Sequence, residues 1–256
     1  MNLKASEGNI TEEIQKQLSF AGELLNRPLS ALQIQQFNSY LSFLLDYNRR
    51  VNLTAINDPI TVISRHFRDS LSCLMVTGEL NGLRLIDVGT GAGFPGIPLI
   101  LACPDLKLTL VDSTTKKTKY LESIIERLNL KNVDIINERI EVLGQDFRYR
   151  AQFDWAVARA VASLPTLAEY LLPLVKISGK MLAMKSEGIT QEYEESLTVI
   201  KKLGGEEGVI QAVQYDLETN GEREVSSHYL LTITKLRNTP SEYPRRIGVP
   251  KKTPLA

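Results

Sequence analysis

Residues 83–96 read LRLIDVGTGAGFPG, and this stretch decides the fold. Its first part, Leu83 to Val88, is a short apolar run that predicts a buried strand containing one acid. Three alternating glycines, Gly89, Gly91 and Gly93, follow directly, and after them comes an apolar segment typical of a helix. A glycine-rich turn between a strand and a helix lets a ligand lie against the backbone, because no Cβ stands in its way. The stretch therefore predicts a binding site for a nucleotide-like small molecule at a first strand–helix turn.

The spacing of the glycines narrows the class of ligand. Dinucleotide sites use G-x-G-x-x-G, whereas here the glycines alternate, and no Gly-Lys-Ser or Gly-Lys-Thr of a P-loop follows them. A second acid, Asp112, ends the next apolar run, 25 residues after Asp87, where an acid accepts hydrogen bonds from ribose hydroxyls in nucleotide-binding α/β folds. This combination resembles the S-adenosylmethionine site of Rossmann-like methyltransferases. Binding of NAD and a purely structural glycine turn stay open at this point.

Composition limits the classes of function. The chain has 256 residues, enough for one large domain or for one domain with an extension. Its 30 basic and 30 acidic residues give a formal net charge of zero, so any binding of nucleic acid has to use a local patch. The two cysteines form no disulfide framework and no zinc spacing, and the two histidines are too few for a histidine-based metal site. We find no membrane-spanning run and no secretory signal, and we expect a cytoplasmic protein without a metal or a membrane partner.

The hydrophobic pattern changes near residue 80. Before it, apolar residues recur at three- and four-residue spacing, which predicts helices, with Ser30 as the cap of one and Asn57-Asp58-Pro59 at the start of another. After it, strands and helices alternate, which predicts a parallel sheet covered on both faces. The expected strands are Leu83–Val88, Lys107–Asp112, Val133–Asn137, Asp154–Ala158 and Lys180–Lys185, with Val209–Tyr215 and His228–Lys235 as a hairpin-like pair at the edge.

This pattern predicts an α/β fold, a Rossmann-like methyltransferase sheet of seven mostly parallel strands with an N-terminal helical extension. We divide the chain into the helical extension, residues 1–82, the methyltransferase domain, residues 83–236, and a basic, proline-rich C-terminal tail, residues 237–256. Four prolines in the tail predict that it is extended.

Nine short segments, read in order, make the resemblance more specific. They are NLTAI (52–56), RHFRDSL (65–71), DVGTGAGFPGIPL (87–99), VDSTTKK (111–117), ERIE (138–141), ARAVA (158–162), MKS (184–186), LGGE (203–206) and YPRRIGVPKKTPL (243–255). Together they span nearly the whole chain and resemble the bacterial small-subunit rRNA guanine-N7 methyltransferases, the RsmG or GidB family. The resemblance implies transfer of a methyl group from S-adenosylmethionine to N7 of one guanine in 16S rRNA, guanine 527 in the family. It also implies 16S rRNA or the assembling small ribosomal subunit as the partner, and we expect a monomer.

The resemblance further implies a set of site residues. The implied contacts to S-adenosylmethionine are Gly89, Phe94, Asp112, Ser113, Thr114, Ile140, Glu141 and Arg159. The first two belong to the glycine loop, the next three to the turn that holds the ribose, and the following two to the adenine side. Arg159 ends the fourth strand, where the family keeps an arginine facing the active site, and it is the one residue to which we give a catalytic role. The carboxyl ends of the strands are where an open α/β sheet binds its ligands, so topology agrees with these positions.

The implied chemistry needs little from side chains. Guanine N7 attacks with a lone pair and has no proton to lose, and the sulfonium methyl is a strong electrophile, so positioning and electrostatics suffice. We therefore name no general base. Arg159 is suited to a hydrogen bond with guanine O6 or to a phosphate contact, and we expect it to orient the substrate from the side.

Several basic residues are candidates for RNA contacts, each with a plainer alternative. Arg65, Arg68 and Asp69 share one face of a predicted helix, which is either an RNA contact or a solvated face with an Arg65–Asp69 pair. His66 is expected to pack or to form hydrogen bonds rather than to act as a base. Arg139 and Lys185 are contacts to RNA, contacts to the cofactor carboxylate, or surface charge.

The end of the chain is the other RNA candidate. The segment from Lys235 to Ala256 has six basic residues and one acid, a composition suited to phosphate contacts, with a solubilising tail as the alternative. Two other functions also stay open: a methyltransferase acting on a small molecule or a protein, and a non-catalytic ribosome-binding protein of the same fold. The presence of both acids and all three glycines argues against an inactive site.

Overall fold

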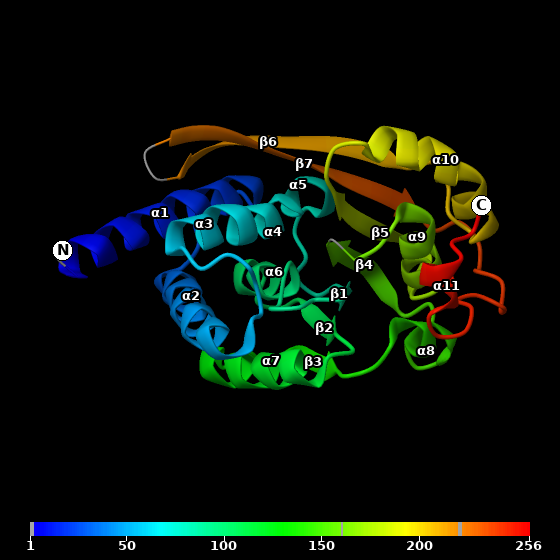
Figure 1. Ribbon diagram of the computed structural model, residues 1–256, viewed down its shortest axis with the longest axis horizontal. Helices are drawn as coiled ribbons and strands as arrows, with labels where there is room; N and C mark the ends of the chain where they lie inside the picture. The colour runs from blue at the N-terminus through cyan, green and yellow to red at the C-terminus, as the bar shows by residue number, and fades with distance from the viewer. Residues whose placement is uncertain (1–2, 160, 220–221) are drawn as a thin grey trace.

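The computed structural model of the chain describes residues 3–159, 161–219 and 222–256, and a seven-stranded sheet lies at its centre (Figure 1). The strands are β1 (Arg84–Val88), β2 (Lys107–Val111), β3 (Val133–Ile136), β4 (Phe153–Arg159), β5 (Val175–Lys185), β6 (Val209–Thr219) and β7 (Glu222–Thr234). Their order is β3-β2-β1-β4-β5-β7-β6, with β1 to β5 parallel and the last two strands forming an antiparallel hairpin. The predicted fold class is confirmed. Ala160, within the segment ARAVA, lies outside the described residues.

Two strands begin well before their predicted starts: β7 begins at Glu222 rather than at His228, and β5 also begins early. β5 starts at Val175, which pairs with Phe153, whereas the prediction began at Lys180, which pairs with Trp155. Between these two pairs the register shifts by a β-bulge, and Ser178 has a positive φ of 67°. The bulged residues are mostly exposed and so interrupt the apolar run from which a buried strand is recognised.

The helices precede the sheet as a group and then alternate with its strands. The first group is α1 (Leu3–Leu24), α2 (Ala31–Val51), α3 (Pro59–Val62), η1 (Ile63–Arg68), α4 (Asp69–Ser72) and α5 (Leu74–Thr77). The remaining helices are α6 (Gly96–Ala102), α7 (Thr115–Leu128), α8 (Ile140–Gln145), α9 (Leu164–Leu171), α10 (Ile189–Lys202) and α11 (Val249–Lys252). None of the described helices is both long enough and apolar enough to cross a membrane.

Two of the predicted helix starts are confirmed by their caps. Ser30 forms a capping box with Gln33, each side chain accepting a hydrogen bond from the other residue's backbone N–H. Asp58 caps α3 through the N–H of Thr61, and Pro59 occupies the first helical position. The helix that follows is not uniform, because η1 is a π-helical turn, wider than the α-helix on which the expected common face of Arg65, Arg68 and Asp69 was based.

The N-terminal helices share a hydrophobic core with one face of the sheet. Buried side chains of α2 and η1 pack with those of α6 and β2, including Tyr40, Phe67, Ile97 and Leu108. The hydroxyl of Tyr40 donates to the carbonyl of Ala92 over 2.7 Å, which joins α2 directly to the glycine turn. A second core lies on the opposite face, beneath α8, α9 and α10. The N-terminal helices thus pack directly on the sheet, and α2 contacts the glycine turn.

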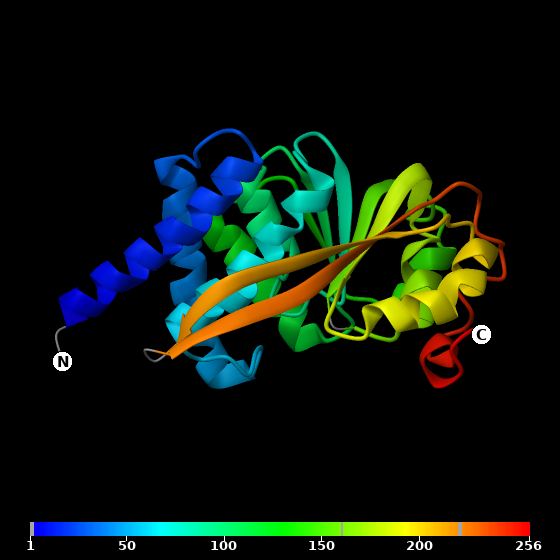
Figure 2. The same cartoon turned by 90° about the horizontal axis from the view of Figure 1, so that it is seen from above.

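The β6–β7 hairpin extends well beyond the sheet. Figure 2 shows it running from the sheet edge across the N-terminal helices. Val213 and Tyr215 of β6 are buried in the same core as these helices, and the Tyr215 hydroxyl lies 2.8 Å from the carbonyl oxygen of Ser64. The hairpin therefore connects the far edge of the sheet with the segment η1–α4.

The end of the chain is not an extended tail, and that prediction is wrong. Residues 249–252 form the short helix α11, and Arg245 is paired with the buried Glu169 at 2.7 Å. Just before the tail, Lys235 is only 1% exposed and donates from Nζ to the carbonyls of Leu172 and Val175 at 2.8 and 2.7 Å. Proline fixes φ but does not keep a segment away from the body of the protein when its side chains and carbonyls find partners there.

The buried Lys235 predicts a particular dependence of stability on pH. Burial, with a smaller effect of Arg150, lowers the pKa of Lys235 from 10.5 to about 8. Between these values the unfolded chain binds more protons than the folded protein, so this group makes stability rise with pH there. We expect wild type to gain free energy of unfolding relative to Lys235→Met as pH rises from about 8 towards 10.5, and the difference to be constant below that window. Urea unfolding at a series of pH values measures it, and parallel curves throughout contradict it.

Candidate functional site

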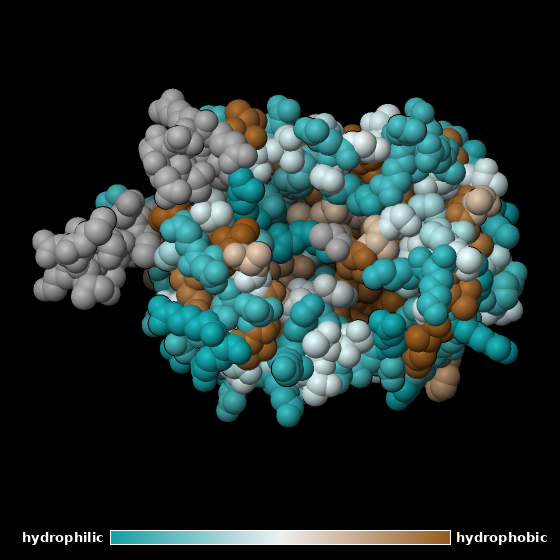
Figure 3. All heavy atoms as spheres, viewed as in Figure 1, coloured by the Kyte–Doolittle hydropathy of each residue, from teal (hydrophilic) through white to brown (hydrophobic). Residues whose placement is uncertain are grey.

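The site lies where the direction of the sheet connections reverses, between β1 and β4. In open α/β sheets, ligands bind outside the carboxyl ends of the strands at this point. Here the segments after β1, β2, β3 and β4 line a cavity of about 330 Å³. Six of the eight predicted cofactor contacts line it, namely Gly89, Asp112, Ser113, Thr114, Ile140 and Glu141. We call it the first cavity. On the face shown in Figure 3, the surface is hollowed near its centre.

The glycine turn needs its glycines for reasons of backbone and space. All three have positive φ, 70° at Gly89, 63° at Gly91 and 101° at Gly93. A Cβ on Gly89 would lie 2.8 Å from Cγ2 of Val161, and one on Gly93 would lie 2.4 Å from Cδ1 of Ile97. The turn therefore allows close approach both to a ligand and to neighbouring side chains.

Asp112 joins the two turns that border the first cavity. Its Oδ1 accepts a hydrogen bond from the N–H of Thr114 at 2.9 Å, and its Oδ2 accepts from the N–H of Gly91 at 3.1 Å. Lys117 is paired with it at 3.4 Å. An ionised carboxylate offers about four acceptor positions, so Asp112 retains capacity for a ligand hydroxyl.

Asp87 is the other acid of the glycine segment, and it is fully buried. Its Oδ2 accepts from Oγ1 of Thr90 at 2.7 Å and from the N–H of Gly96 at 2.8 Å. Its Oδ1 has no hydrogen-bond partner among the residues that the structure describes. Burial raises the pKa of Asp87 to about 6. A buried acceptor without a partner beside the glycine turn fits a site whose ligand or bound water brings hydrogen-bond donors.

A second cavity, of about 250 Å³, adjoins the first. It is lined by Arg159, Asp69 and His228, together with residues at the end of β5, and Ala162 lines both cavities. Arg159 lines only this second cavity, and Phe94 is buried beneath its guanidinium, which lies 5.1 Å from the ring centroid. The structure thus brings six predicted cofactor contacts together and places the other two beside them.

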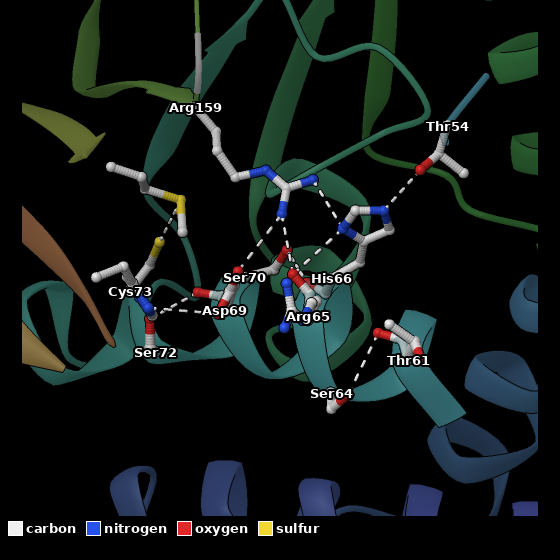
Figure 4. A network of polar contacts seen from close by, with 12 residues as sticks. Thr54, Thr61, Ser64, Arg65, His66, Asp69, Ser70, Ser72, Cys73 and Arg159 are labelled. Atoms are coloured by element: carbon white, nitrogen blue, oxygen red, sulfur yellow. Dashed lines mark hydrogen bonds and ion pairs between the residues drawn. The ribbon is translucent and has the colours of Figure 1, made fainter. Parts of the chain in front are cut away.

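The guanidinium of Arg159 is held from several sides (Figure 4). From β4 it points at the segment η1–α4, where Nη1 lies 3.3 Å from the carbonyl oxygen of Arg65 and 3.9 Å from Oδ2 of Asp69. Its Nη2 lies 3.3 Å from Nδ1 of His66. A planar guanidinium fixed in this way can present its remaining N–H groups to a ligand in one orientation.

His66 is a neutral hydrogen-bonding side chain, as expected. Burial, and next the positive charge of Arg159, lower the pKa of His66 to about 3. Its Nε2 lies 2.9 Å from Oγ1 of Thr54, and its ring packs on Phe94 with centroids 4.7 Å apart. At neutral pH the imidazole is a weak base and serves to fix its neighbours.

Asp69 connects Arg159 with the β6–β7 hairpin. Its Oδ1 lies 3.3 Å from Nδ1 of His228 and contacts the Tyr215 hydroxyl. Burial raises the pKa of Asp69, against the effect of its partners, His228 first. Burial also lowers the pKa of His228. Sequence reasoning missed His228 and Tyr215 as site residues, because only the fold brings the hairpin to this point.

The two other basic candidates lie at different cavities. Arg139 is exposed and lines the first cavity, whereas Lys185 lines the second. Lys185 donates to the carbonyl of Ala162 at 3.1 Å and is paired with Glu192 at 2.8 Å. Lys185 therefore helps to hold the wall that the cavities share. Within the described part of the chain, no group of three or more His, Cys, Asp or Glu residues could hold a metal ion.

Comparison with known proteins agrees with this geometry. Residues 33–220 match the family model of rRNA small subunit methyltransferase G. The chain belongs to this family. It is 40% identical to the ribosomal RNA small subunit methyltransferase G of Alkaliphilus oremlandii, over 95% of this chain and 99% of that protein. It is 45% identical to the protein of the same name from Acetivibrio thermocellus, over 87% of this chain and 89% of that protein.

Solved structures share the fold of this small subunit methyltransferase G family member. One is an S-adenosylmethionine-dependent O-methyltransferase from Thermotoga maritima, with a TM-score of 0.52, 18% identity, and coverage of 77% of this chain and 72% of that one. Another is an O-methyltransferase from Bacillus cereus in complex with SAH, with a TM-score of 0.52, 18% identity, and coverage of 77% and 91%. Membership of the family makes this chain an rRNA methyltransferase, and its fold is that of the two solved methyltransferases.

The position of Asp112 predicts its effect on cofactor binding. Asp112→Asn keeps one oxygen acceptor but removes the charge and the second acceptor, so we expect the Kd for S-adenosylhomocysteine to rise about tenfold, the size of one charged hydrogen bond. Isothermal titration calorimetry measures it. Asp105→Asn, which changes an exposed acid outside the cavity, is the matched control. Equal Kd values for wild type and both variants contradict the assignment.

Proposed function

We propose that this chain transfers the methyl group of S-adenosylmethionine to N7 of a guanine in 16S rRNA, at the position of guanine 527. One observation supports this beyond membership of the family. A cavity with a ribose-type acid and a glycine turn adjoins a second cavity with a fixed arginine, and the two share Ala162. A donor and an acceptor of the methyl group can therefore lie side by side. Such a substrate would place the enzyme in the cytoplasm, on the 16S rRNA or the assembling small subunit.

The first cavity is the proposed cofactor site. Asp112 with Ser113 and Thr114 would bind the ribose, while Ile140 and Glu141 would face the adenine. Gly89 would allow the close approach of the cofactor to the end of β1. Phe94 is buried, so its proposed contribution to the cofactor site is indirect, through the packing of Arg159 and His66.

The proposed reaction needs positioning more than proton transfer. S-adenosylmethionine supplies an electrophilic methyl group on its sulfonium, and guanine N7 supplies the lone pair. The imidazole of His66, 3.3 Å from Arg159, has a pKa of about 3 and is not suited to remove a proton. This agrees with a reaction in which no proton has to leave before the methyl group is transferred.

Arg159 is proposed to orient the guanine through O6. Its N–H groups that do not face Arg65, His66 or Asp69 are available to an acceptor in the second cavity. Methylation places positive charge on the purine, and a cation beside N7 would oppose the reaction. The carboxylate of Asp69, 3.9 Å from the guanidinium of Arg159, offsets part of the positive charge of Arg159.

RNA phosphates are proposed to bind at a third, basic cavity rather than mainly at the C-terminal segment. This cavity, of about 490 Å³, lies between the end of α2 and the start of α7 and is lined by Arg49, Arg50, Lys116 and Lys119, with no carboxylate among its described lining residues. Lys116 and Lys119 are exposed and follow directly on the turn that borders the first cavity. Arg50 in this cavity is paired with Asp46 at 3.1 Å. At the C-terminus, Lys235 and Arg245 bind other parts of the protein, whereas Arg246, Lys251 and Lys252 are exposed.

The function is tested by the product. Purified protein is incubated with methyl-labelled S-adenosylmethionine and 16S rRNA, or small subunits, that lack the modification, and the RNA is digested to nucleosides. Label in 7-methylguanosine from one position supports the proposal. Label in another nucleoside, or no label in RNA from a protein that binds S-adenosylhomocysteine, refutes it and favours another substrate.

The role of Arg159 predicts a loss of turnover without a loss of cofactor affinity. Arg159→Lys keeps the charge but not the planar arrangement of donors, so we expect kcat/KM for RNA methylation to fall about thirtyfold, corresponding to about 2 kcal/mol. The Kd for S-adenosylhomocysteine should stay within about twofold, because Arg159 does not line the first cavity. Single-turnover methylation and calorimetry give the two values. A normal rate, or a loss explained by weaker cofactor binding alone, contradicts the role.

The basic cavity predicts the salt dependence of RNA binding. A lysine that binds one phosphate adds about one to the slope of log K against log salt, so Lys116→Ala/Lys119→Ala should make this slope shallower by about two. The control is Lys107→Ala/Lys131→Ala, which also removes two positive charges. Both lysines are exposed and lie near the N-terminal ends of β2 and β3, away from the basic cavity, so this variant should leave the slope unchanged. Fluorescence anisotropy with labelled rRNA fragments at several salt concentrations measures both. Equal slopes for the two double variants contradict this surface.

A further inference from the structure

The C-terminal segment, residues 236–256, is fastened to the helices that border the first cavity. Arg150 donates to the carbonyls of Thr239 and Tyr243, each over 2.7 Å, and to that of Pro240 at 3.0 Å. Gln145 of α8 donates to the carbonyl of Pro244 at 2.8 Å. These bonds set the path of the segment along α8 before it reaches the cavity.

An ion pair then fixes the segment to α9. Arg245 donates from Nε and Nη2 to the two carboxylate oxygens of Glu169, with a shortest distance of 2.7 Å, and its backbone N–H also donates to Glu169. Glu169 is fully buried, so it depends on this partner for compensation of its charge. The hydrogen bonds to Glu169 raise the pKa of Arg245, and the charge of Arg245 is compensated within the protein.

The next contact reaches a residue of the first cavity. The backbone N–H of Gly248 donates to Oε1 of Glu141 at 2.9 Å, and the hydroxyl of Tyr170 donates to the same oxygen at 3.2 Å. Glu141 and Tyr170 both line the cavity, and Glu141 is only 4% exposed. Oγ1 of Thr166, also on α9, donates to the carbonyl of Pro250 at 3.0 Å. The hydrogen bonds of Gly248 and Pro250 therefore hold the residues just before Lys251 beside Glu141, at one end of the first cavity.

Lys251 itself lines the first cavity, whereas its exposed neighbour Lys252 does not. The lysine ammonium has three donors and no acceptor, and it suits the ring nitrogens of adenine and the oxygens of ribose, which accept hydrogen bonds. Its neighbour Glu141 belongs to the adenine side of the proposed cofactor site. This end of the cavity therefore contains a positively charged side chain, Lys251, which comes from the last helix of the chain, α11.

We propose that the C-terminal segment forms a wall of the cofactor site and that Lys251 binds the adenosine part of S-adenosylmethionine. The proposal rests on the proposed function, since it takes the first cavity as the cofactor site. It gives the segment a role that does not involve RNA. The contacts of Arg245 and Gly248 with α8 and α9 hold Lys251 in place for this role.

Cofactor affinity in the absence of RNA tests the proposal. Lys251→Ala and Lys252→Ala remove the same charge from adjacent exposed positions and leave the ion pair of Arg245 intact. The probes are S-adenosylhomocysteine and adenosine, which lack the positive sulfonium, so that a change in net charge of the site has little effect on them. We expect Lys251→Ala to raise both Kd values about tenfold, as for the removal of a hydrogen bond from a charged group, and Lys252→Ala to change them less than about twofold.

Each other outcome has a distinct meaning. Unchanged Kd values for Lys251→Ala overturn the proposal, and so do equal losses in both variants, which would indicate a general effect of charge. A loss for S-adenosylhomocysteine without a loss for adenosine overturns the assignment to the adenosine part. If the wild type binds neither probe, the cofactor site of the proposed function fails instead.

Hydrogen exchange on the wild type gives a second readout that needs no variant. Binding of S-adenosylhomocysteine should slow amide exchange in residues 248–252, because the ligand would be held against them. Slower exchange in the glycine turn together with unchanged exchange in residues 248–252 overturns the proposal while it supports the cofactor site.

Discussion

The carboxylate of Asp87 holds the two ends of the glycine turn together, and the rest of the site depends on this. One of its oxygens accepts from Thr90 inside the turn and from Gly96 at the start of α6. Tyr40 of α2 binds the same turn from outside, through the carbonyl of Ala92. The turn is thus fixed both by its own strand and by the N-terminal helices. Asp112 can then meet the N–H of Gly91, which joins the ends of β1 and β2 into one cavity wall.

The second cavity shows the same principle over longer distances in sequence. Arg159 comes from β4, Asp69 from α4, and His228 from β7. The hairpin, which crosses the N-terminal helices, brings His228 to Asp69. Each of these groups is mostly buried, so each needs the others to compensate the loss of water. A change in the position of the hairpin would therefore alter the surroundings of Arg159 without any change in β4.

The sequence predicted what depends on local pattern. Strand–helix alternation predicted the sheet and its order of elements, and Ser30 and Asp58 marked helix starts because capping needs only nearby residues. The early start of β5 was missed, since its bulged residues are exposed and resemble a loop. The π-turn of η1 was missed because residue types do not distinguish it from an α-helical turn. The family resemblance implied eight cofactor contacts, and the fold places six of them at one cavity, but His228 and Tyr215 gave no local signal of their place in the site.

Charge in a sequence does not show which groups are already paired. The end of the chain has six basic residues and one acid, yet Lys235 is buried against carbonyl oxygens and Arg245 is bound by Glu169. Their partners lie on β5, on α9 and in the loop between them, far away in sequence, so a count of charge overestimates what is free to meet a phosphate. The lysines next to the turn after β2 attract less notice in the sequence, because Glu122 and Glu126 in the same helix offset part of their charge. In the fold they line a basic cavity beside the proposed cofactor site. Where RNA can bind thus depends on which charges the fold leaves exposed together, and in the basic cavity four such residues come from two helices that are far apart in sequence.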